Sequence, residues 1–303
     1  MRYTVECVPN FSEGRDAGKM QAIHEAVLDG PGVASLGLTM DPDHNRSVIT
    51  LAGTPQGVRE AALRAIARAA SLIDLNRHVG VHPRIGATDV VPFVPLTGSS
   101  LKECVGIAEF VAAQAWARYG VPTYLYEAAA RRADRRNLES VRRGRFEGLR
   151  EEVRVNPDRK PDFGEAALHP TAGATAVGAR NFLIALNVNL NTLNVEIAKA
   201  IAQRVRSSGG GLPCLKALGL YLPSKSVAQV SMNLTDFKTT SLGAAFEAVE
   251  READGLGVGV LESELVGLIP RAALEGAPLD RMKIPSFSPD VILENRLARL
   301  KSH

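Results

Sequence analysis

Apolar positions in the first half of the chain switch between the two-residue period of strands and the three-to-four-residue period of helices. Short β-prone runs predict strands at 3–8, 33–38, 47–51, 89–94 and 122–126. Amphipathic spacing predicts helices at 19–28, 54–73 and 100–119. The order of these elements is typical of an α+β or mixed α/β layer, in which helices cover one face of a sheet.

The second half of the chain shows a similar order of elements. The pattern predicts a strand, a helix, a hairpin, a helix and a strand at 182–191, 195–205, 215–234, 241–252 and 257–262, and a last amphipathic helix at 290–300. Each half therefore follows the ferredoxin-like βαββαβ order, and we expect two subdomains, 1–180 and 181–303. If their sheets face each other, they form a groove where small-molecule sites tend to lie.

Two segments before the second half lack this periodicity. The stretch 127–159 carries arginines in pairs among acidic residues, which indicates a solvated helical connector; contact with RNA is the less favoured alternative. The stretch 161–178 is rich in glycine, proline and alanine and is expected to be a long loop, and long loops in compact domains are often functional.

Composition narrows the class of protein. The 303-residue chain has 45% hydrophobic and 23% charged residues, which is ordinary for a soluble globular protein. A net charge of +3 and an aromatic content of 5% argue against nucleic-acid binding. Three widely spaced cysteines, the lack of a signal-peptide pattern, and no run near the ~20 apolar residues that span a bilayer together predict a reduced, cytoplasmic protein.

The segment 77–95, RHVGVHPRIGATDVVPFVP, concentrates the candidate chemistry. His82 is the candidate acid/base catalyst, because an imidazole titrates near neutral pH. Arg84 could hold a carboxylate by a bidentate fork. Asp89 could orient an imidazole or Arg84. A purely structural Arg–Asp pair stays open as an alternative.

No metal or nucleotide site is predicted. His78 and His82 have the i, i+4 spacing of zinc ligands on a helix, but Gly80 and Pro83 disfavour a helix there and no third ligand is obvious. The chain also lacks a Walker A loop and a GxGxxG motif after a strand, so ATP and NAD have no fingerprint.

Two further polar clusters lie beside predicted strands. The run 41–46, DPDHNR, could offer Asp41 and Arg46 to a ligand, or it could be an ordinary Asp-Pro-Asp turn. Ser12, Glu13 and Gly14 could form an anion-binding nest at a helix N-terminus, or a simple helix cap.

Asparagine is disfavoured in strands, yet Asn187 and Asn189 share one face of the strand predicted at 182–191. Asn233 lies in a similar run within the predicted hairpin. This pattern favours a polar sheet surface that hydrogen-bonds a ligand rich in amide and amine edges, such as a pteridine, over a solvent-facing edge strand.

Several segments, in the same order along the chain, resemble the glutamate formimidoyltransferase family. They are VECVPNFSEG at 5–14, the segment 77–95, YLYEAAA at 124–130, PDFG at 161–164 and AQVSMNLTDF at 228–237. In this family, bifunctional formimidoyltransferase-cyclodeaminases of histidine breakdown carry a second, helical half. That half is missing before the chain stops at His303, so we expect a stand-alone transferase and a separate cyclodeaminase.

The resemblance implies transfer of a formimidoyl group from N-formimidoyl-L-glutamate to tetrahydrofolate, the co-substrate, without a metal. It also implies a homodimer in which the two α/β subdomains of each chain enclose a folate-binding tunnel. Two alternatives stay open: formyl transfer between 5-formyltetrahydrofolate and glutamate, and a folate-binding protein without activity.

The resemblance also implies roles for individual residues. His82 matches the catalytic histidine of the family, and Asp89 or Asp41 would assist it. Asp41 matches the family's acidic residue only after a small shift, because Thr39-Met40 precede it. We expect the other substrate-binding residues to be His78, Arg84, Arg46, Asn187, Asn189 and Asn233. We expect the folate-binding loop to comprise Phe163, Gly164, Glu165, Ala166, Ala167, Leu168, His169, Pro170, Thr171 and Ala172.

Overall fold

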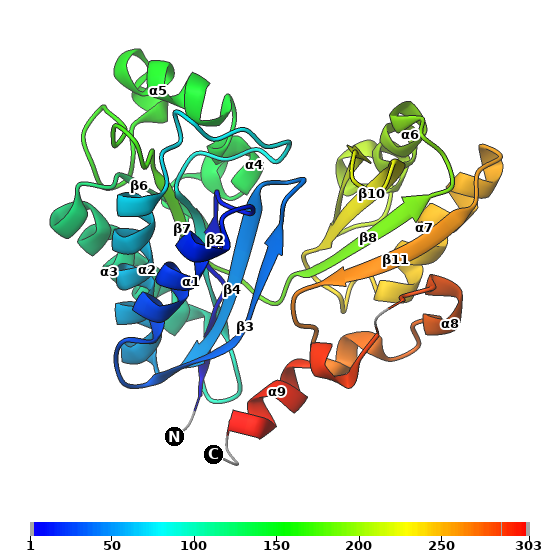
Figure 1. Ribbon diagram of the computed structural model, residues 1–303, viewed down its shortest axis with the longest axis horizontal. Coiled ribbons are helices and arrows are strands. Elements are labelled where there is room, and N and C mark those ends of the chain that lie inside the picture. The colour runs from blue at the N-terminus through cyan, green and yellow to red at the C-terminus, as the bar shows by residue number, and fades with distance from the viewer. Residues whose placement is uncertain (1–2, 286, 301–303) are drawn as a thin grey trace. The chain divides into compact units, whose positions relative to one another are not determined.

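The computed structural model of the chain describes residues 3–285 and 287–300 (Figure 1). The chain divides into two compact units, one ending at Arg180 and the other beginning at Asn181. Each unit has its own sheet and its own hydrophobic core. Both units mix helices with strands, which confirms the predicted α/β (α+β) class.

The sheet of the first unit is a ferredoxin-like sheet that two parallel strands extend. Its strands are β1 (Val5–Cys7), β2 (Asn10–Phe11), β3 (Val33–Asp41), β4 (Arg46–Gly53), β5 (Thr88–Pro95), β6 (Thr123–Glu127) and β7 (Thr175–Ala179). β1 and β2 pair with β4 on one side and β5 on the other, and β3 pairs with β4, all antiparallel. β7 then pairs in parallel with both β5 and β6.

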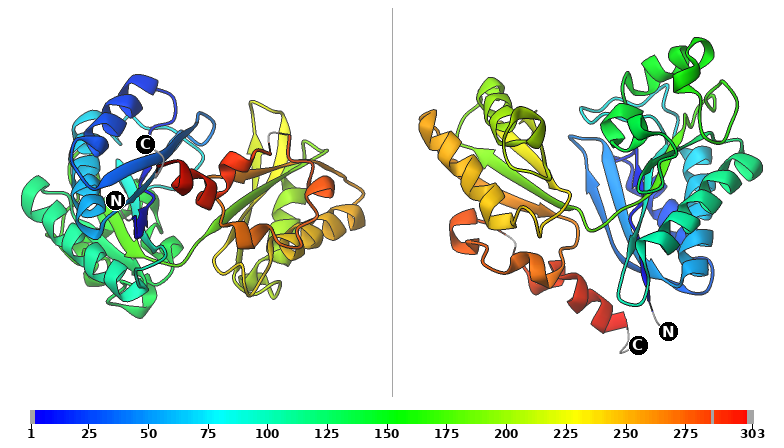
Figure 2. Two further views of the ribbon diagram at one scale, coloured as in Figure 1. Left: turned by 90° about the horizontal axis from the view of Figure 1, so that it is seen from below. Right: turned by 180° about the vertical axis from the view of Figure 1, so that it is seen from behind.

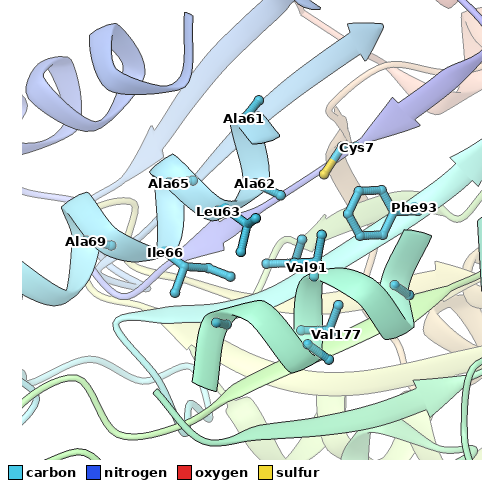
Figure 3. Packing of buried hydrophobic residues seen from close by; sticks show 14 of the residues in the cluster. Cys7, Ala61, Ala62, Leu63, Ala65, Ile66, Ala69, Val91, Phe93 and Val177 are labelled. Carbon is cyan, nitrogen blue, oxygen red and sulfur yellow. The ribbon is translucent and has the colours of Figure 1, made fainter. Parts of the chain in front are cut away.

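One face of this sheet is covered by α1 (Ala17–Leu28), α2 (Pro55–Leu72) and α3 (Leu101–Tyr119) (Figure 1). Figure 3 shows Leu63 and Ile66 of α2 pointing toward Val91 of β5 in the core beneath the helix. The alanines of α2 let the helix approach the sheet closely, and burial of its apolar stripe stabilises the unit by about 25 cal/mol for each Å² removed from water.

The arginine-rich segment differs from the solvated connector that we predicted. It forms α4 (Leu138–Val141) and α5 (Arg145–Val155), flanked by 3-10 turns at Ala133–Arg135 and Pro157–Arg159. Val141 and Leu149 pack in a second apolar cluster with Tyr124 and Tyr126 of β6. The prediction was wrong because single arginines of the segment, such as Arg135 and Arg159, turn inward and are buried with their partners.

The Gly/Pro/Ala-rich stretch is a loop only in its first part. Its end forms β7, which the prediction of an unbroken loop to residue 178 missed. Every residue of β7 is buried, and its side chains are small. A parallel strand that is buried on both faces has no polar alternation, so the pattern gave no sign of it.

The second unit has the predicted βαββαβ order. It contains β8 (Ile184–Leu190), α6 (Val195–Val205), β9 (Leu215–Leu222), β10 (Val227–Leu234), α7 (Leu242–Gly255) and β11 (Val260–Val266). The strands are arranged in the order β11-β8-β10-β9, all antiparallel. α6 and α7 cover one face of this sheet (Figures 1 and 2). The other face carries the asparagines singled out from the sequence.

Several boundaries in the second unit differ from the prediction, and α7 and β11 both end later, at Gly255 and Val266. The last strand begins at Val260 rather than at residue 257, because Gly257 has a positive φ of 73° and turns the chain after α7. The last helix, α9, spans Leu293–Leu300 and follows a 3-10 turn at Pro289–Val291. Between them lie a 3-10 turn at Arg271–Leu274 and the short helix α8 (Leu279–Met282).

Candidate active site

His82 lies in the loop between α2 and β5, and one of its two ring nitrogens contacts other groups of the protein. Its Nδ1 is 2.8 Å from the carbonyl oxygen of Pro83 and 3.0 Å from Nη1 of Arg46. A protonated Nδ1 donates to Pro83, whereas an unprotonated Nδ1 accepts from Arg46, so one proton cannot satisfy both. The Nε2 atom of His82 makes no hydrogen bond within the described residues, and it is the nitrogen that a substrate can use.

The surroundings of His82 favour its neutral form. Burial, followed by the positive charges of Arg46 and Arg142, lowers the pKa of His82 well below its ordinary value. A neutral imidazole with Nδ1–H donated to Pro83 carries its lone pair on Nε2. In that state His82 can accept a proton, and its conjugate acid is a strong proton donor.

Asp89 binds two arginines instead of His82. Its Oδ2 atom is 2.9 Å from Nη1 of Arg46 and 2.5 Å from Nη2 of Arg142, and its Oδ1 accepts from the backbone N–H of Ile85. The side chain of Asp89 is fully buried. Burial acts to raise the pKa of Asp89, but the guanidinium groups of Arg142 and Arg46 outweigh it and the pKa is lowered.

Arg46 is the first residue of β4 and links this cluster to Asn10 of β2. Its Nε and Nη2 atoms donate to Oδ1 of Asn10, at 3.1 and 2.7 Å. Burial, and then the charge of Arg142, lowers the pKa of Arg46 to about 10. The structure therefore brings Arg46, Asp89 and His82 together, with Asn10 and Arg142 as partners that the sequence analysis missed.

Arg84 and His78 form a separate pair beside this cluster. Arg84 binds Glu147 of α5 through two hydrogen bonds of 2.9 and 2.7 Å, and its Nε donates to Nδ1 of His78. The Nε2 atom of His78 donates to the carbonyl of Asn45. Both ring nitrogens of His78 are thus used within the protein, and the fork of Arg84 expected for a substrate carboxylate holds Glu147.

Asp41 pairs with a histidine that the sequence analysis did not single out. Oδ2 of Asp41 lies 2.7 Å from Nδ1 of His44, and Oδ1 accepts from the backbone N–H of the same residue. The ring of His44 lies edge-on to that of His82, with 6.0 Å between centroids. The turn 41–46 is therefore both Asx-type turn chemistry and part of the site, and Asp41 reaches His82 only through His44.

The residues that follow β2 fix the position of the turn 41–46. Gly14 donates its N–H to Oδ1 of Asn45, and a Cβ on Gly14 would lie 2.2 Å from the carbonyl oxygen of Asp41 and 2.4 Å from the backbone nitrogen of Arg46. Oε1 of Glu13 accepts from the backbone N–H groups of Arg15 and Asp16. Within the suggested anion nest, the N–H of Gly14 is thus used by the Asn45 amide and that of Ser12 by the carbonyl of Ala87, while the carboxylate of Glu13 binds the next two N–H groups.

The asparagines of the second unit differ in burial and in the hydrogen bonds that their side-chain amides make. Asn189 is buried, donates to Glu262 and accepts from Gln229, so its amide is satisfied by neighbouring strands. Asn187 is buried, and its side chain makes no hydrogen bond with any described residue. Asn233 is exposed on the same face. The free amide of Asn187 suits ligand binding best.

The expected folate loop is held to the first unit at both ends. The carbonyl of Phe163 accepts from Thr123, and that of Thr171 accepts from Leu75. Nδ1 of His169 accepts from the N–H groups of Thr171 and Ala172 at 3.3 and 3.0 Å, so a neutral His169 carries its proton on Nε2. Between the anchors, Gly164, Glu165 and Ala167 are exposed and accessible to a ligand.

Neither a metal cluster nor a membrane helix occurs in the part of the chain that the structure describes. Among residues 3–285 and 287–300, no three His, Cys, Asp or Glu side chains gather in a group that could hold a metal ion. Within the same ranges, no helix has the length and apolar character needed to cross a bilayer.

Sequence comparisons match nearly the whole chain. A family model described as "Formiminotransferase domain, N-terminal subdomain" matches residues 4–180, and one described as "Formiminotransferase domain" matches 185–279. The glutamate formimidoyltransferase of Streptococcus pyogenes serotype M1 is 44% identical over 298 residues, which cover 98% of this chain and 99% of that protein. That of Thermoplasma acidophilum is 43% identical and covers 97% of both chains. The formimidoyltransferase-cyclodeaminase of Sus scrofa is 45% identical over 90% of this chain and 51% of its own length.

Proposed function

Because this chain belongs to the formiminotransferase family, we propose that it transfers the formimidoyl group of N-formimidoyl-L-glutamate to tetrahydrofolate, giving 5-formimidoyltetrahydrofolate and L-glutamate. The identity of 44% with a full-length glutamate formimidoyltransferase supports this reaction. The geometry that best supports it is the single open nitrogen of His82, Nε2, on a ring whose other nitrogen is held by Pro83 and Arg46.

His82 acts as the proton shuttle in this proposal. N5 of tetrahydrofolate attacks the formimidoyl carbon, and Nε2 of His82 takes the proton that N5 loses. The tetrahedral intermediate then collapses as His82 returns this proton to the departing glutamate nitrogen. The low pKa of His82 suits both steps, because the ring is neutral at rest and its imidazolium is a strong acid. Holding two substrates together adds a proximity contribution.

Asp89 and Asp41 act on His82 only through other side chains in this mechanism. Asp89 fixes Arg46, which in turn lies against Nδ1 of His82. Asp41 fixes the ring of His44 beside His82. Both carboxylates are therefore positioning residues in our proposal, rather than groups that touch the reacting atoms.

We further propose that residues 163–172 contact the folate and, separately, that the amide of Asn187 hydrogen-bonds a substrate. The exposed middle of the loop and the unused amide support this assignment. The wider setting that we propose is a cytoplasmic homodimer in histidine breakdown. A cyclodeaminase, the second activity in the name of the Sus scrofa relative, would process the product.

The test consists of two parallel assays on the purified protein. Tetrahydrofolate is incubated with N-formimidoylglutamate in one and with N-formylglutamate in the other, and the 5,10-methenyl product is read by its absorbance after acid quench. We expect signal with the formimidoyl donor. Signal with the formyl donor alone would replace the proposal by formyl transfer, and folate binding without either signal would favour a binding protein.

A further inference from the structure

Three arginines with largely buried side chains lie on or next to the loop that carries His82, and they differ in how many of their N–H groups are used. Arg84 is engaged by Glu147 and His78 through all three nitrogens. Arg46 is likewise engaged through all three, by Asn10, Asp89 and His82. Each of these two guanidinium groups therefore uses at least three of its five N–H groups within the protein, whereas Arg142 uses one.

Arg142 is different, because only its Nη2 atom is engaged. Nη2 donates to Asp89, whereas Nε and Nη1 make no hydrogen bond within residues 3–285 and 287–300. Nε is shielded from solvent without a partner. Because Nε is shielded and Nη1 is not, Nη1 is the donor of this guanidinium that a ligand can contact. The side chain retains 10% of its surface exposed, so a ligand can reach the guanidinium.

The cluster of Arg142, Arg46 and Asp89 has an excess positive charge that an anion would neutralise. Arg46 and Arg142 together carry two positive charges, and the single carboxylate of Asp89 lies between them. His82 contributes no negative charge. A positive charge thus remains uncompensated in a largely buried cluster, where desolvation makes an unpaired charge unfavourable. A substrate carboxylate would neutralise it through a charge-assisted hydrogen bond.

The position of Arg142 relative to His82 selects which carboxylate. Arg142 and Arg46 donate to the same oxygen of Asp89, and Arg46 lies against the ring of His82. Arg142 is therefore only a short chain of hydrogen bonds away from the catalytic imidazole. In N-acylated glutamate, the α-carboxylate is attached to the carbon that bears the nitrogen to which His82 returns its proton. The γ-carboxylate lies farther along the side chain.

We propose that Arg142 binds the α-carboxylate of the amino-acid donor through Nη1, while Nη2 stays on Asp89. This inference rests on the proposed function and assigns its donor-binding residue. It also moves the carboxylate-binding role, which the sequence suggested for Arg84 and Arg46, to a residue of the arginine-rich segment. Arg142 would thereby hold the leaving nitrogen of the donor beside Nε2 of His82.

The first part of the test is a binding measurement that needs no turnover. Calorimetry on the wild-type protein compares L-glutamate with L-isoglutamine, which has an amide at the α-carboxylate, and with L-glutamine, which has one at the γ-carboxylate. We expect isoglutamine to bind about ten- to a hundredfold more weakly than glutamate, as loss of a charged hydrogen bond predicts. Equal binding of glutamate and isoglutamine would overturn the assignment.

The second part uses Arg142→Lys, which keeps the charge beside Asp89 but loses the spare guanidinium nitrogens. We expect this variant to bind glutamate and isoglutamine equally. We also expect a KM for N-formimidoylglutamate raised about ten- to a hundredfold, with the KM for tetrahydrofolate unchanged. Arg143→Lys, at an exposed neighbouring position, is the control and should match the wild type.

The outcomes separate this inference from the proposed function. Wild-type protein that turns over neither donor yet discriminates isoglutamine through Arg142 would defeat the proposed function and leave the carboxylate site standing. A raised KM for tetrahydrofolate alone in Arg142→Lys would assign Arg142 to the glutamate tail of folate and overturn the inference. Loss of discrimination against glutamine, instead of isoglutamine, would overturn the choice of the α-carboxylate.

Discussion

Nη1 of Arg46 lies 3.0 Å from Nδ1 of His82, so a permanent positive charge borders the ring nitrogen that faces away from the substrate. This contact opposes protonation of His82 and adds to the effect of burial on its pKa. Since the proposed shuttle begins with a neutral ring, activity should persist down to pH values below the ordinary titration range of histidine.

Replacing Arg46 should move the acid limb of the pH profile. Arg46→Gln removes a positive charge beside the imidazolium, which raises the pKa of His82, so the fall in kcat/KM at low pH should begin at a higher pH than in the wild type. Asp89→Asn removes a negative charge from the same cluster and should shift the limb in the opposite direction. Profiles of kcat/KM against pH check both signs, and identical profiles for the three proteins would exclude His82 as the titrating group.

Removing the imidazole should abolish most of the turnover. We expect His82→Ala to lower kcat by roughly 10²–10⁴-fold, the usual contribution of a general acid/base catalyst. The fold should persist, because no described residue bonds to Nε2 and Arg46 remains held by Asn10 and Asp89. Circular dichroism and single-turnover rates check this, with His24→Ala in α1 as the control histidine. Near-normal turnover of His82→Ala would rule out the shuttle.

The pair of Arg135 and Asp162 should be a large contributor to stability. Both side chains are buried and lie 2.8 Å apart, and Asp162 also accepts from the N–H of Leu125. Asp162→Ala leaves the buried charge of Arg135 without its counter-ion and the N–H of Leu125 without its acceptor, so we expect a loss of about 3–5 kcal/mol in the free energy of unfolding. Urea unfolding at pH 7 measures it.

An exposed pair in the same segment is the matched control for Asp162. Asp134 binds Arg132 at 3.0 Å, and both side chains lie at the surface. Asp134→Ala should change the unfolding free energy much less than Asp162→Ala, because solvent screens exposed ion pairs. Equal losses in the two variants would show that burial does not determine the strength of these pairs.

A methyl group on Gly14 should disturb the site from a distance. The added Cβ would collide with backbone atoms of Asp41 and Arg46, which cannot move aside as a flexible side chain does. Gly14→Ala should therefore displace the turn that carries Arg46 and lower kcat about tenfold or more, since small misplacements cost large factors in rate. Gly106→Ala in α3, where a Cβ meets nothing within 4 Å, should leave kcat unchanged and stabilise the helix by about 0.5–1 kcal/mol.

Local patterns in the sequence were enough to predict the class of the fold and the segment that carries the candidate chemistry. Apolar periodicity is a local property, so it identified β8 to β10 and α6 almost to the residue, as well as α1, α2 and α3 of the first unit. His82 stood out because few residue types shuttle protons near neutral pH. Its neighbours Arg46 and Asp89 were found because they lie in short polar runs beside predicted strands.

The pairing of charged side chains, in contrast, became visible only in the folded chain. Arg142 reads as one of many solvated arginines, yet the fold of α4 brings it to Asp89, 53 residues earlier in the chain. From the sequence, the guanidinium of Arg84 was expected to bind a substrate carboxylate, yet it binds the carboxylate of Glu147 in α5. Strand β7 escaped detection because a strand buried on both faces has no alternation to read. Periodicity reports which side of an element is buried, whereas ion-pair partners depend on long-range packing that no local pattern encodes.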